Sequence, residues 1–149
     1  MRLLLASLGV VLLVSVGCSD VSPPTAPDAA PVDPATSAPM GVGVSGNWVR
    51  TGYAVAGRAT LVIEGNTAQL DFSSNFSIAQ TPGAIVYLNT TSNPNMGQPL
   101  RIGALRSFQG AQSYRFQVPL GVRYTRIIIW CDPFNVGMAE VVIPPTGAP

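Results

Sequence analysis

Cys18 and Cys131 are the only cysteines of this 149-residue chain, and their thiols are its sharpest candidates for chemistry. The chain has no histidine, and all eight of its basic residues are arginine. The absence of histidine removes Ser–His and Cys–His nucleophile pairs and His-ligated zinc, copper or haem. The absence of lysine removes Schiff-base and P-loop chemistry. We therefore expect no catalytic constellation, no bound cofactor and no metal centre, and the chain is predicted not to be an enzyme.

Cys18 follows an apolar run, Leu3–Val16, that begins just after Arg2. One basic residue, an apolar core and small residues before a cysteine are typical of a secretory signal, and the run is too short for an ordinary spanning helix. The residues Ser15-Val16-Gly17-Cys18 resemble a bacterial lipobox, with serine at the position where leucine is usual. This resemblance implies a lipoprotein signal peptide at 1–17 and lipid, including palmitate, on Cys18 as a membrane anchor.

The residue that follows Cys18 indicates in which membrane the lipoprotein resides. Ser19, and not an aspartate, follows Cys18. By the sorting habit of enterobacterial lipoproteins, this implies the outer membrane, at its periplasmic face or on the cell surface, in preference to the inner membrane. We expect the bacterial cell envelope as the location, with the lipid bilayer and an envelope protein as partners and no nucleic acid.

Residues 18–45 are dominated by proline, alanine, serine and threonine, and they show no periodic apolar face. Such a segment cannot bury enough apolar surface to order itself. We expect a disordered, extended, polyproline-like linker that holds a domain away from the membrane.

Residues 46–143 show the period of two that is typical of β-strands. The runs 58–64 and 67–72 alternate on either side of Gly65-Asn66, which is a two-residue hairpin signal. Two further runs are apolar at every position, as expected of strands buried on both faces: 84–88 and 126–131. Strands are also expected at 113–118 and 136–143, with a tail at 144–149. The predicted fold class is all-β, a single antiparallel β-sandwich or partly open barrel of about eight short strands.

Several motifs follow one another in order along this predicted domain. They are Gly46-Asn47-Trp48, Gly57-Arg58-Ala59, Phe76, Val86-Tyr87-Leu88, Gly103-Ala104-Leu105, Gly110-Ala111-Gln112-Ser113-Tyr114, Pro119, Trp130-Cys131, Phe134-Asn135-Val136 and Ala139. In this order they resemble the DM-thirteen (DM13) extracellular domain, which is often found beside DOMON modules and has been proposed to take part in electron transfer. The resemblance covers nearly the whole of 46–143 and implies the same β-rich fold.

Two stretches depart from that family's pattern. Thr81-Pro82-Gly83 stands where the family has Gly-Pro-Asp, so the family's acidic residue is missing. The stretch after Phe134 is shorter than usual and lacks the customary Phe-Gly. These departures weaken a transfer of function more than a transfer of fold.

Cys131 is the strongest candidate for redox chemistry. An exposed thiolate there could exchange with disulfides, sense oxidants or contribute one metal ligand. Cys131 shares a strand face with Ile127 and Ile129, however, and free cysteine is among the most buried residue types. The preferred interpretation is therefore packing, ahead of redox use or pairing with another chain.

Trp130 and Met138 each have a functional and a structural interpretation. Trp130 points to the opposite strand face and is either an electron-hopping or stacking residue or, in the preferred interpretation, an aromatic of the core or of the contact between sheets. Met138 is expected to fill the core, because one thioether without histidine or a second thiolate is a poor metal site.

Charged side chains are few in the predicted domain, with seven arginines against four carboxylates, a net charge of +3. Glu64 and Asp71 are predicted to lie on the solvent side of the hairpin, where they could face each other. The preferred interpretation is a solvated face, and the alternatives are a calcium site or a carboxylate pair for glycoside hydrolysis. The arginines lie at scattered strand positions, so we expect them to keep the outward faces soluble.

Three functional hypotheses follow. The favoured one is a membrane-anchored envelope lipoprotein whose sandwich is a non-catalytic binding or structural module. The first alternative is a redox accessory domain that acts through Cys131, with a partner that carries the cofactor because this chain lacks the cysteines for an iron–sulfur cluster and the histidine for haem. The second alternative is a calcium- or glycan-binding protein.

Overall fold

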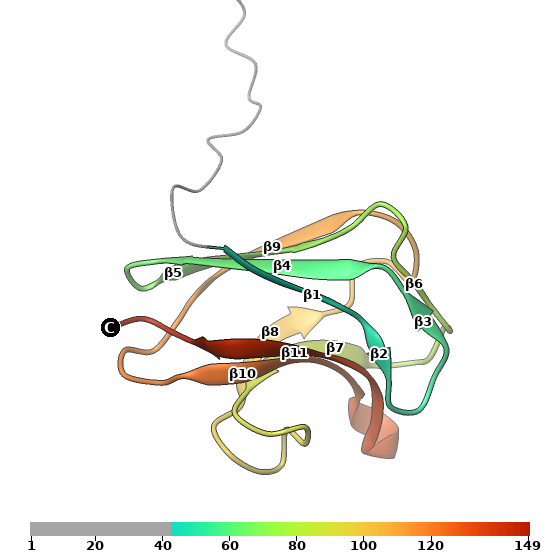
Figure 1. Cartoon of the computed structure of the whole chain (residues 1–149). Helices are drawn as coiled ribbons and strands as arrows, with labels where there is room; N and C mark the ends of the chain where they lie inside the picture. Colours follow the sequence, from blue (N-terminus) through green and yellow to red (C-terminus); the bar gives the residue numbers. More distant parts are fainter. Residues whose placement is uncertain (1–42) are drawn as a thin grey trace, which may run out of the picture. The chain divides into compact units, whose positions relative to one another are not determined.

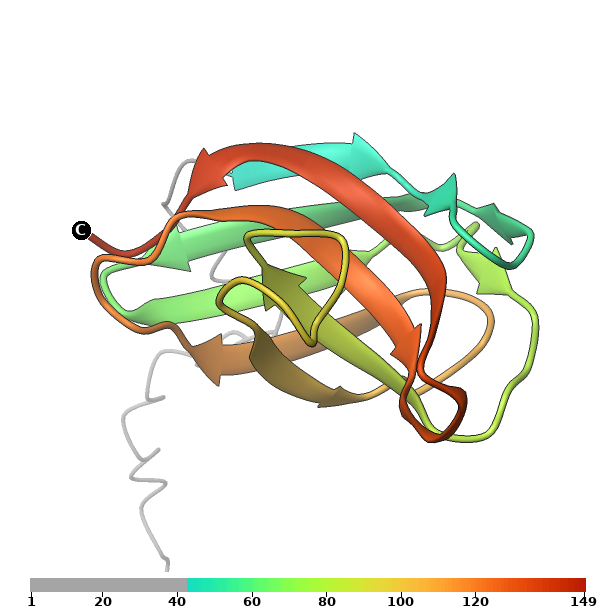
Figure 2. The same ribbon diagram turned by 90° about the horizontal axis from the view of Figure 1, so that it is seen from below.

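The computed structural model describes residues 43–149. The predicted signal peptide, Cys18 and the linker up to residue 42 lie outside the described residues. Within 43–149 the chain folds into two antiparallel sheets that face each other, as Figures 1 and 2 show from two sides. The prediction of an all-β sandwich is confirmed, and the sheets do not close into a barrel.

The first sheet has four strands in the order β1-β4-β5-β9, and all neighbours are antiparallel. The strands are β1 (Gly43–Asn47), β4 (Arg58–Glu64), β5 (Thr67–Phe72) and β9 (Gln112–Gln117). The second sheet has five strands in the order β2-β11-β10-β7-β8. They are β2 (Val49–Arg50), β11 (Val136–Thr146), β10 (Tyr124–Cys131), β7 (Ala84–Asn89) and β8 (Leu100–Ala104).

Three short elements complete the fold at one end of the sandwich. The strands β3 (Val55–Ala56) and β6 (Ser77–Ile78) pair with each other, and a 3-10 helix, η1 (Asp132–Phe134), joins β10 to β11. The described residues therefore contain eleven strands, more than the eight that were predicted. The additional ones are mostly two residues long, and a two-residue strand has no period that a sequence pattern can reveal.

The β4–β5 hairpin agrees with its prediction residue by residue. Ala59, Leu61, Ala68 and Leu70 point between the sheets and are buried, while most residues between them face outward. The turn has Gly65 at a φ of +56°, a conformation that glycine adopts without strain.

Strand β10 is the centre of the second sheet, with β7 on one side and β11 on the other. Its residues from Ile127 to Cys131 are all buried, and so is every residue of β7. The sequence predicted this from the unbroken apolar runs. A strand buried on both faces needs cover on its outer side as well as on the side that faces the other sheet.

Both ends of the domain differ from the predicted boundaries. Strand β1 begins at Gly43, so the last three residues of the predicted linker belong to the first sheet. Gly46 allows the two sheets to approach closely, because a Cβ at this position would lie 2.4 Å from a methyl carbon of Val141. At the other end β11 continues to Thr146, through Pro144 and Pro145 of the predicted tail. The prolines are accommodated because the pairing with β10 is irregular there, between Tyr124 and Arg126.

The core between the sheets includes four aromatic side chains at the end where β3 and β6 lie. Trp48 meets Phe72 edge-on at 4.9 Å between ring centroids, and Phe76 lies 4.8 Å from Phe72. Tyr114 completes the group at 5.7 Å from Phe72. Aromatic pairs in tilted and edge-on arrangements such as these stabilise a core beyond the area that they bury.

The outer face of β7 and β10 is covered by the loop 90–99, as Figure 2 shows. Asn89, the one polar residue that is fully buried within 43–149, holds this loop. Its Nδ2 donates to the carbonyl oxygens of Asn93 at 2.7 Å and Met96 at 2.9 Å, and its Oδ1 accepts from the backbone N–H of Thr90 at 2.8 Å. The side chain thus replaces the backbone partners that an irregular loop lacks.

We predict that Asn89→Ala destabilises the protein by about 2–3 kcal/mol, because several buried polar groups lose their partner at once. Gln98→Ala is the matched control, since Gln98 lies on the same loop, is exposed and makes no side-chain hydrogen bond within residues 43–149, and its substitution is expected to cost no more than about 0.5 kcal/mol. Urea unfolding followed by tryptophan fluorescence measures both. Equal losses in the two variants would contradict the role given to Asn89.

Candidate functional site

Cys131 ends β10 on the face that points between the sheets, and its side chain has no exposed surface. It lies in the main core cluster together with Ile127 and Ile129, as the alternation predicted. The Sγ–H donates a hydrogen bond to the carbonyl oxygen of Pro82 at 3.2 Å. Because a thiolate cannot donate, this contact belongs to the protonated thiol.

A second sulfur lies under the same turn. Met138 of β11 is fully buried, and its Sδ accepts a hydrogen bond from the Thr81 hydroxyl at 3.2 Å. Two consecutive residues of the turn Thr81–Gly83 therefore each contact one of the two buried sulfurs. The prediction that Met138 fills the core is confirmed by its burial in the main cluster.

The turn Thr81–Gly83 is held firmly over Cys131. The carbonyl oxygen of Gly83 accepts from the backbone N–H of Asp132 at 3.1 Å. Gly83 has a φ of +67°, and a Cβ there would lie 2.6 Å from the ring carbons of Pro133. Only glycine suits this position. Pro82 and Gly83 are themselves exposed, so Cys131 lies just beneath the surface and behind one tightly packed turn.

Trp130 lies on the opposite face of β10, as expected, in a small cluster with Ile85, Tyr87 and Ile128. This cluster is on the outer face of the second sheet, so Trp130 does not lie between the sheets. The inward positions of β10 are taken by Ile127, Ile129 and Cys131, and alternation leaves Trp130 outside. Its ring is 8% exposed and packs on Gly137, where a Cβ would come within 3.2 Å of it.

Tyr87 and Asp132 form a polar contact beside Trp130. The Tyr87 hydroxyl donates to both carboxylate oxygens of Asp132, at 2.9 and 3.1 Å. Arg101 approaches the same carboxylate at 3.8 Å. Burial, followed by the hydrogen bond and the charge of Asp132, raises the pKa of Tyr87 from its ordinary value of 10.0, and Arg101 opposes this shift. Tyr87 is therefore a neutral hydrogen-bond donor at physiological pH. Sequence reasoning missed this pair, because its members are 45 residues apart.

The carboxylates of the predicted hairpin pair do not meet. In the observed register Glu64 lies opposite Thr67 and Asp71 lies opposite Thr60, so the expectation that they face each other was wrong. Asp71 instead accepts hydrogen bonds from Gln69 and Ser113. Within residues 43–149 no group of three or more histidine, cysteine, aspartate and glutamate side chains is placed to hold a metal ion.

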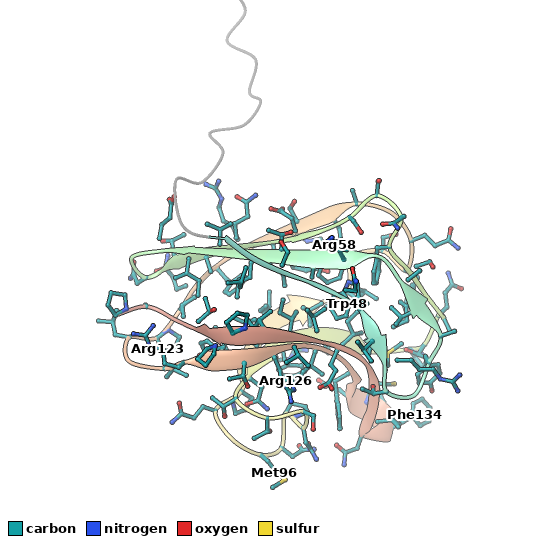
Figure 3. All side chains as sticks on the ribbon, in the orientation of Figure 1. Trp48, Arg58, Met96, Arg123, Arg126 and Phe134 are labelled. Atoms are coloured by element: carbon teal, nitrogen blue, oxygen red, sulfur yellow. The ribbon has the colours of Figure 1, made fainter. Side chains whose placement is uncertain are left out.

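The arginines are spread over both sheets. Figure 3 places Arg58 on the four-stranded side and Arg123 and Arg126 on the other side of the sandwich. Arg126 is partly buried, and its Nε lies 3.3 Å from a carboxylate oxygen of Glu140 on the neighbouring strand. The described residues thus agree with the expectation of scattered positive charge.

Two large apolar side chains project into solvent on neighbouring segments. Phe134 of η1 is 64% exposed and Met96 of the loop 90–99 is 62% exposed, and Figure 3 shows both pointing away from the sheets. The segments are joined by a hydrogen bond of 2.6 Å from Asn95 Nδ2 to Asn135 Oδ1. Val136, also exposed, begins β11 shortly after η1. We refer to Phe134, Val136 and Met96 as the Phe134–Met96 patch.

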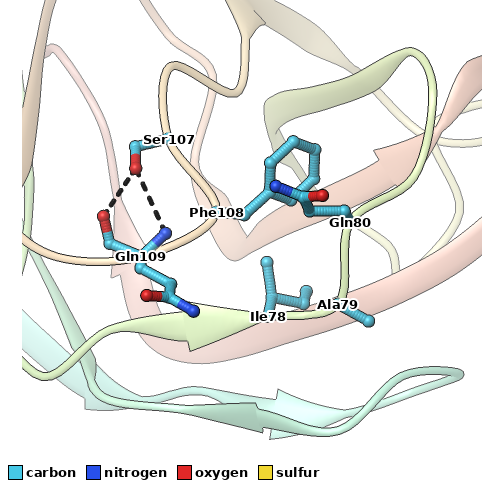
Figure 4. A pocket seen from close by; sticks show the side chains of 6 residues that line it. All are labelled: Ile78, Ala79, Gln80, Ser107, Phe108 and Gln109. Atoms are coloured by element: carbon cyan, nitrogen blue, oxygen red, sulfur yellow. Dashed lines mark hydrogen bonds between the residues drawn. The ribbon is translucent and has the colours of Figure 1, made fainter.

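A concavity of about 520 Å³ lies at the end of the sandwich, between the segments that follow β6 and precede β9. Figure 4 shows its lining, which consists of Ile78, Ala79, Gln80, Ser107, Phe108 and Gln109. No motif in the sequence singled these residues out. They come from two segments about thirty positions apart, and lone glutamines and one phenylalanine in loops carry no spacing signal.

The family comparison agrees with the resemblance noted in the sequence. A family described as Electron transfer DM13 matches residues 49–143, which run from β2 into β11. No curated protein and no solved structure was found to match the chain. Among residues 43–149 no helix has the length and apolar character that crossing a membrane requires.

We predict that Cys131 resists thiol reagents in the native protein and reacts only after unfolding, because its sulfur is covered by a turn that packs on Pro133. The measurement uses the full chain with Cys18→Ser, so that Cys131 is the single thiol, and follows release of thionitrobenzoate with and without denaturant. Ser92→Cys added to Cys18→Ser supplies an exposed thiol on the loop 90–99 as the positive control. If Cys131 in the native protein were labelled as fast as the thiol added in this control, the buried position would be contradicted.

Proposed function

The chain belongs to the DM13 family, described as an electron-transfer domain, and from this premise we propose that it is a lipid-anchored envelope protein that serves electron transfer as a non-catalytic docking module. The cofactor belongs to its protein partner. The sandwich positions that partner at the membrane and carries out no bond chemistry of its own.

The observation that carries this proposal is the state of the Cys131 sulfur. It is fully buried among aliphatic side chains and donates a hydrogen bond to Pro82. A reactive cysteine needs solvent access and a neighbouring cation that stabilises the thiolate. A buried thiol that donates to a carbonyl group is instead suited to packing.

The Phe134–Met96 patch supports docking. Aromatic residues and methionine are enriched in protein–protein interfaces, where they supply contact area without charge. The patch is presented by supported segments, because Asn89 fixes the loop that carries Met96 and the Asn95–Asn135 bond joins that loop to the residue after η1. A pre-organised surface of this kind loses little conformational entropy when a partner binds.

The membrane anchor is proposed from the sequence, since Cys18 lies outside the described residues. The apolar run before it and the lipobox-like residues favour a diacylglyceryl-type lipid on Cys18, and two acyl chains suffice for stable anchoring. Envelope localisation, with preference for the outer membrane, is part of the same proposal.

A second candidate function, redox chemistry at Cys131, is favoured by one observation. The sulfur lies directly behind the exposed residues Pro82 and Gly83, so a displacement of this turn alone would uncover it. In this alternative the Cys131 thiolate attacks a disulfide of the partner, a mixed disulfide forms and the partner's second sulfur leaves as a thiol, while the turn controls access.

The two functions predict different effects of substitution in a strain that lacks the chain and is complemented with variants. We expect Phe134→Ser to reduce the rate at which intact cells pass electrons to ferricyanide by at least about fivefold, as for loss of a central apolar contact in an interface. Cys131→Ala is expected to restore the full rate. Leu120→Ser is the matched control, because Leu120 is equally exposed but lies at another part of the sandwich surface. Full activity of Phe134→Ser together with loss in Cys131→Ala would overturn docking and favour the redox function.

For the anchor, we predict that Cys18→Ser abolishes incorporation of radiolabelled palmitate and moves the protein from the membrane to the soluble fraction of cell lysates. The reason is that one buried CH₂ group contributes about 0.8 kcal/mol, so two lost acyl chains remove the membrane affinity. Cys131→Ser serves as the control for cysteine chemistry and is expected to retain the label. A membrane-bound, unlabelled wild-type protein would refute the lipid anchor.

A further inference from the structure

The concavity of Figure 4 is the middle of a longer groove. A second concavity, of about 410 Å³, shares Ile78, Ala79 and Gln109 with it and continues along β3. A third, of about 370 Å³, shares Gln80 and Phe108 and continues over the turn Thr81–Gly83. We call these three adjoining concavities, which share lining residues at the end of the sandwich, the groove.

Within the groove walls, the backbone of β6 is paired on both of its sides. β6 pairs with β3 on one side, and on the other Ser77 forms a bridge with Gln109. The backbone N–H of Ile78 donates to the carbonyl oxygen of Phe108 at 2.9 Å. An extended peptide that adds a strand needs unpaired backbone groups at an edge. Strand β6 therefore offers no edge for strand addition, and recognition along it falls to side chains.

The polar side chains available for recognition are two amides and, on the β3 side, the Ser77 hydroxyl. Among residues 43–149 neither the Gln80 nor the Gln109 side chain has a hydrogen-bond partner, whereas the Ser107 hydroxyl is engaged with the backbone of Gln109 at 2.6 Å. A primary amide both donates and accepts. Figure 4 shows Phe108 next to Gln80, with Gln109 farther along the lining, and the half-buried Phe108 ring packs against the core.

No charged side chain lines any of the three concavities. The remaining lining is small and apolar, with Ala54, Val55 and Ala56 on the β3 side. An ionic ligand would find no counter-charge in the groove. A neutral ligand suits this lining better. Its hydroxyl and amide groups can bond the glutamine amides, an apolar ring face can pack on Phe108, and a small methyl group can contact the alanines.

From these features we propose that the groove binds a neutral oligosaccharide of N-acetylated hexosamines. The Phe108 ring packs against the apolar face of a sugar ring, and the Gln80 and Gln109 amides bond its hydroxyl and acetamido groups. The alanine-rich wall accommodates the acetyl methyl. This site includes neither the Cys131 sulfur nor the Phe134–Met96 patch, so ligand binding there can fail or succeed independently of the proposed docking function.

The test is a titration of the full chain carrying Cys18→Ser with chitotetraose, followed by ¹H–¹⁵N NMR. We expect shifts confined to the backbone and side-chain amides of the groove, with a dissociation constant on the order of 1 mM, as for a shallow and solvent-open site. Cellotetraose, which has the same ring chain without acetamido groups, is expected to bind at least about fivefold more weakly.

Two exposed substitutions test the assignment without disturbing the core. Gln80→Ala and Gln109→Ala are each expected to weaken chitotetraose binding about fivefold, the effect of one lost hydrogen bond. Gln98→Ala, at an exposed position on the loop 90–99, is the matched control and should bind normally. Phe108→Leu keeps the packing against the core and should also weaken binding.

Four results would overturn the proposal. They are the absence of shifts up to the solubility limit of chitotetraose, shifts located outside the groove, cellotetraose binding as strong as that of chitotetraose, and tetra-alanine producing the same shifts in the groove.

Discussion

The burial of β10 on both of its faces is the constraint on which the rest of this structure depends. A strand in this position must present apolar side chains in both directions, and each direction must be covered. The four-stranded sheet covers the inner side, and the loop 90–99, fixed by Asn89, crosses the outer side. This constraint separates the two candidate redox residues of the sequence. Cys131 is directed into the main core and Trp130 into the outer cluster, so adjacency in the chain does not give them a common site.

The exposed surfaces that could bind a ligand or a partner lie at the end of β10, and not along it. A buried central strand offers no reactive surface along its length, so binding residues must lie on the segments that join the strands. At the end where η1 follows β10, three surfaces lie close to the core: the turn over the two sulfurs, the neutral groove and the Phe134–Met96 patch. Each is supported by hydrogen bonds to a sheet or to a neighbouring loop. The sandwich thus acts as a rigid frame for loops, which is how folds of this class support binding.

The sequence predicted the parts of the fold that rest on local periodicity. The runs 58–64 and 67–72 agree with β4 and β5 to the residue, and the apolar runs identified β7 and β10. The hairpin register also followed from the predicted two-residue turn Gly65-Asn66, which places Thr67 opposite Glu64 and Thr60 opposite Asp71. The expectation that Glu64 meets Asp71 was wrong because it did not apply this register. The groove could not be predicted from the sequence, because Gln80 and Gln109 are brought together only by the pairing of β6 with the segment before β9. Non-local pairing of short segments leaves no periodic signal.

The departure from the family pattern at Gly83 gives the strongest argument about the role of Cys131. The turn there needs a positive φ, and the ring of Pro133 occupies the space of a side chain at 2.6 Å. An aspartate at this position, as the family resemblance would have it, would have to shift Pro133 or open the turn. With glycine the turn closes on η1 and brings the Pro82 carbonyl group to 3.2 Å from the Cys131 sulfur. Glycine at position 83 thus permits tight cover over the sulfur. Such cover favours a packing role for the Cys131 sulfur. Partner recognition then falls to the exposed residues around the turn.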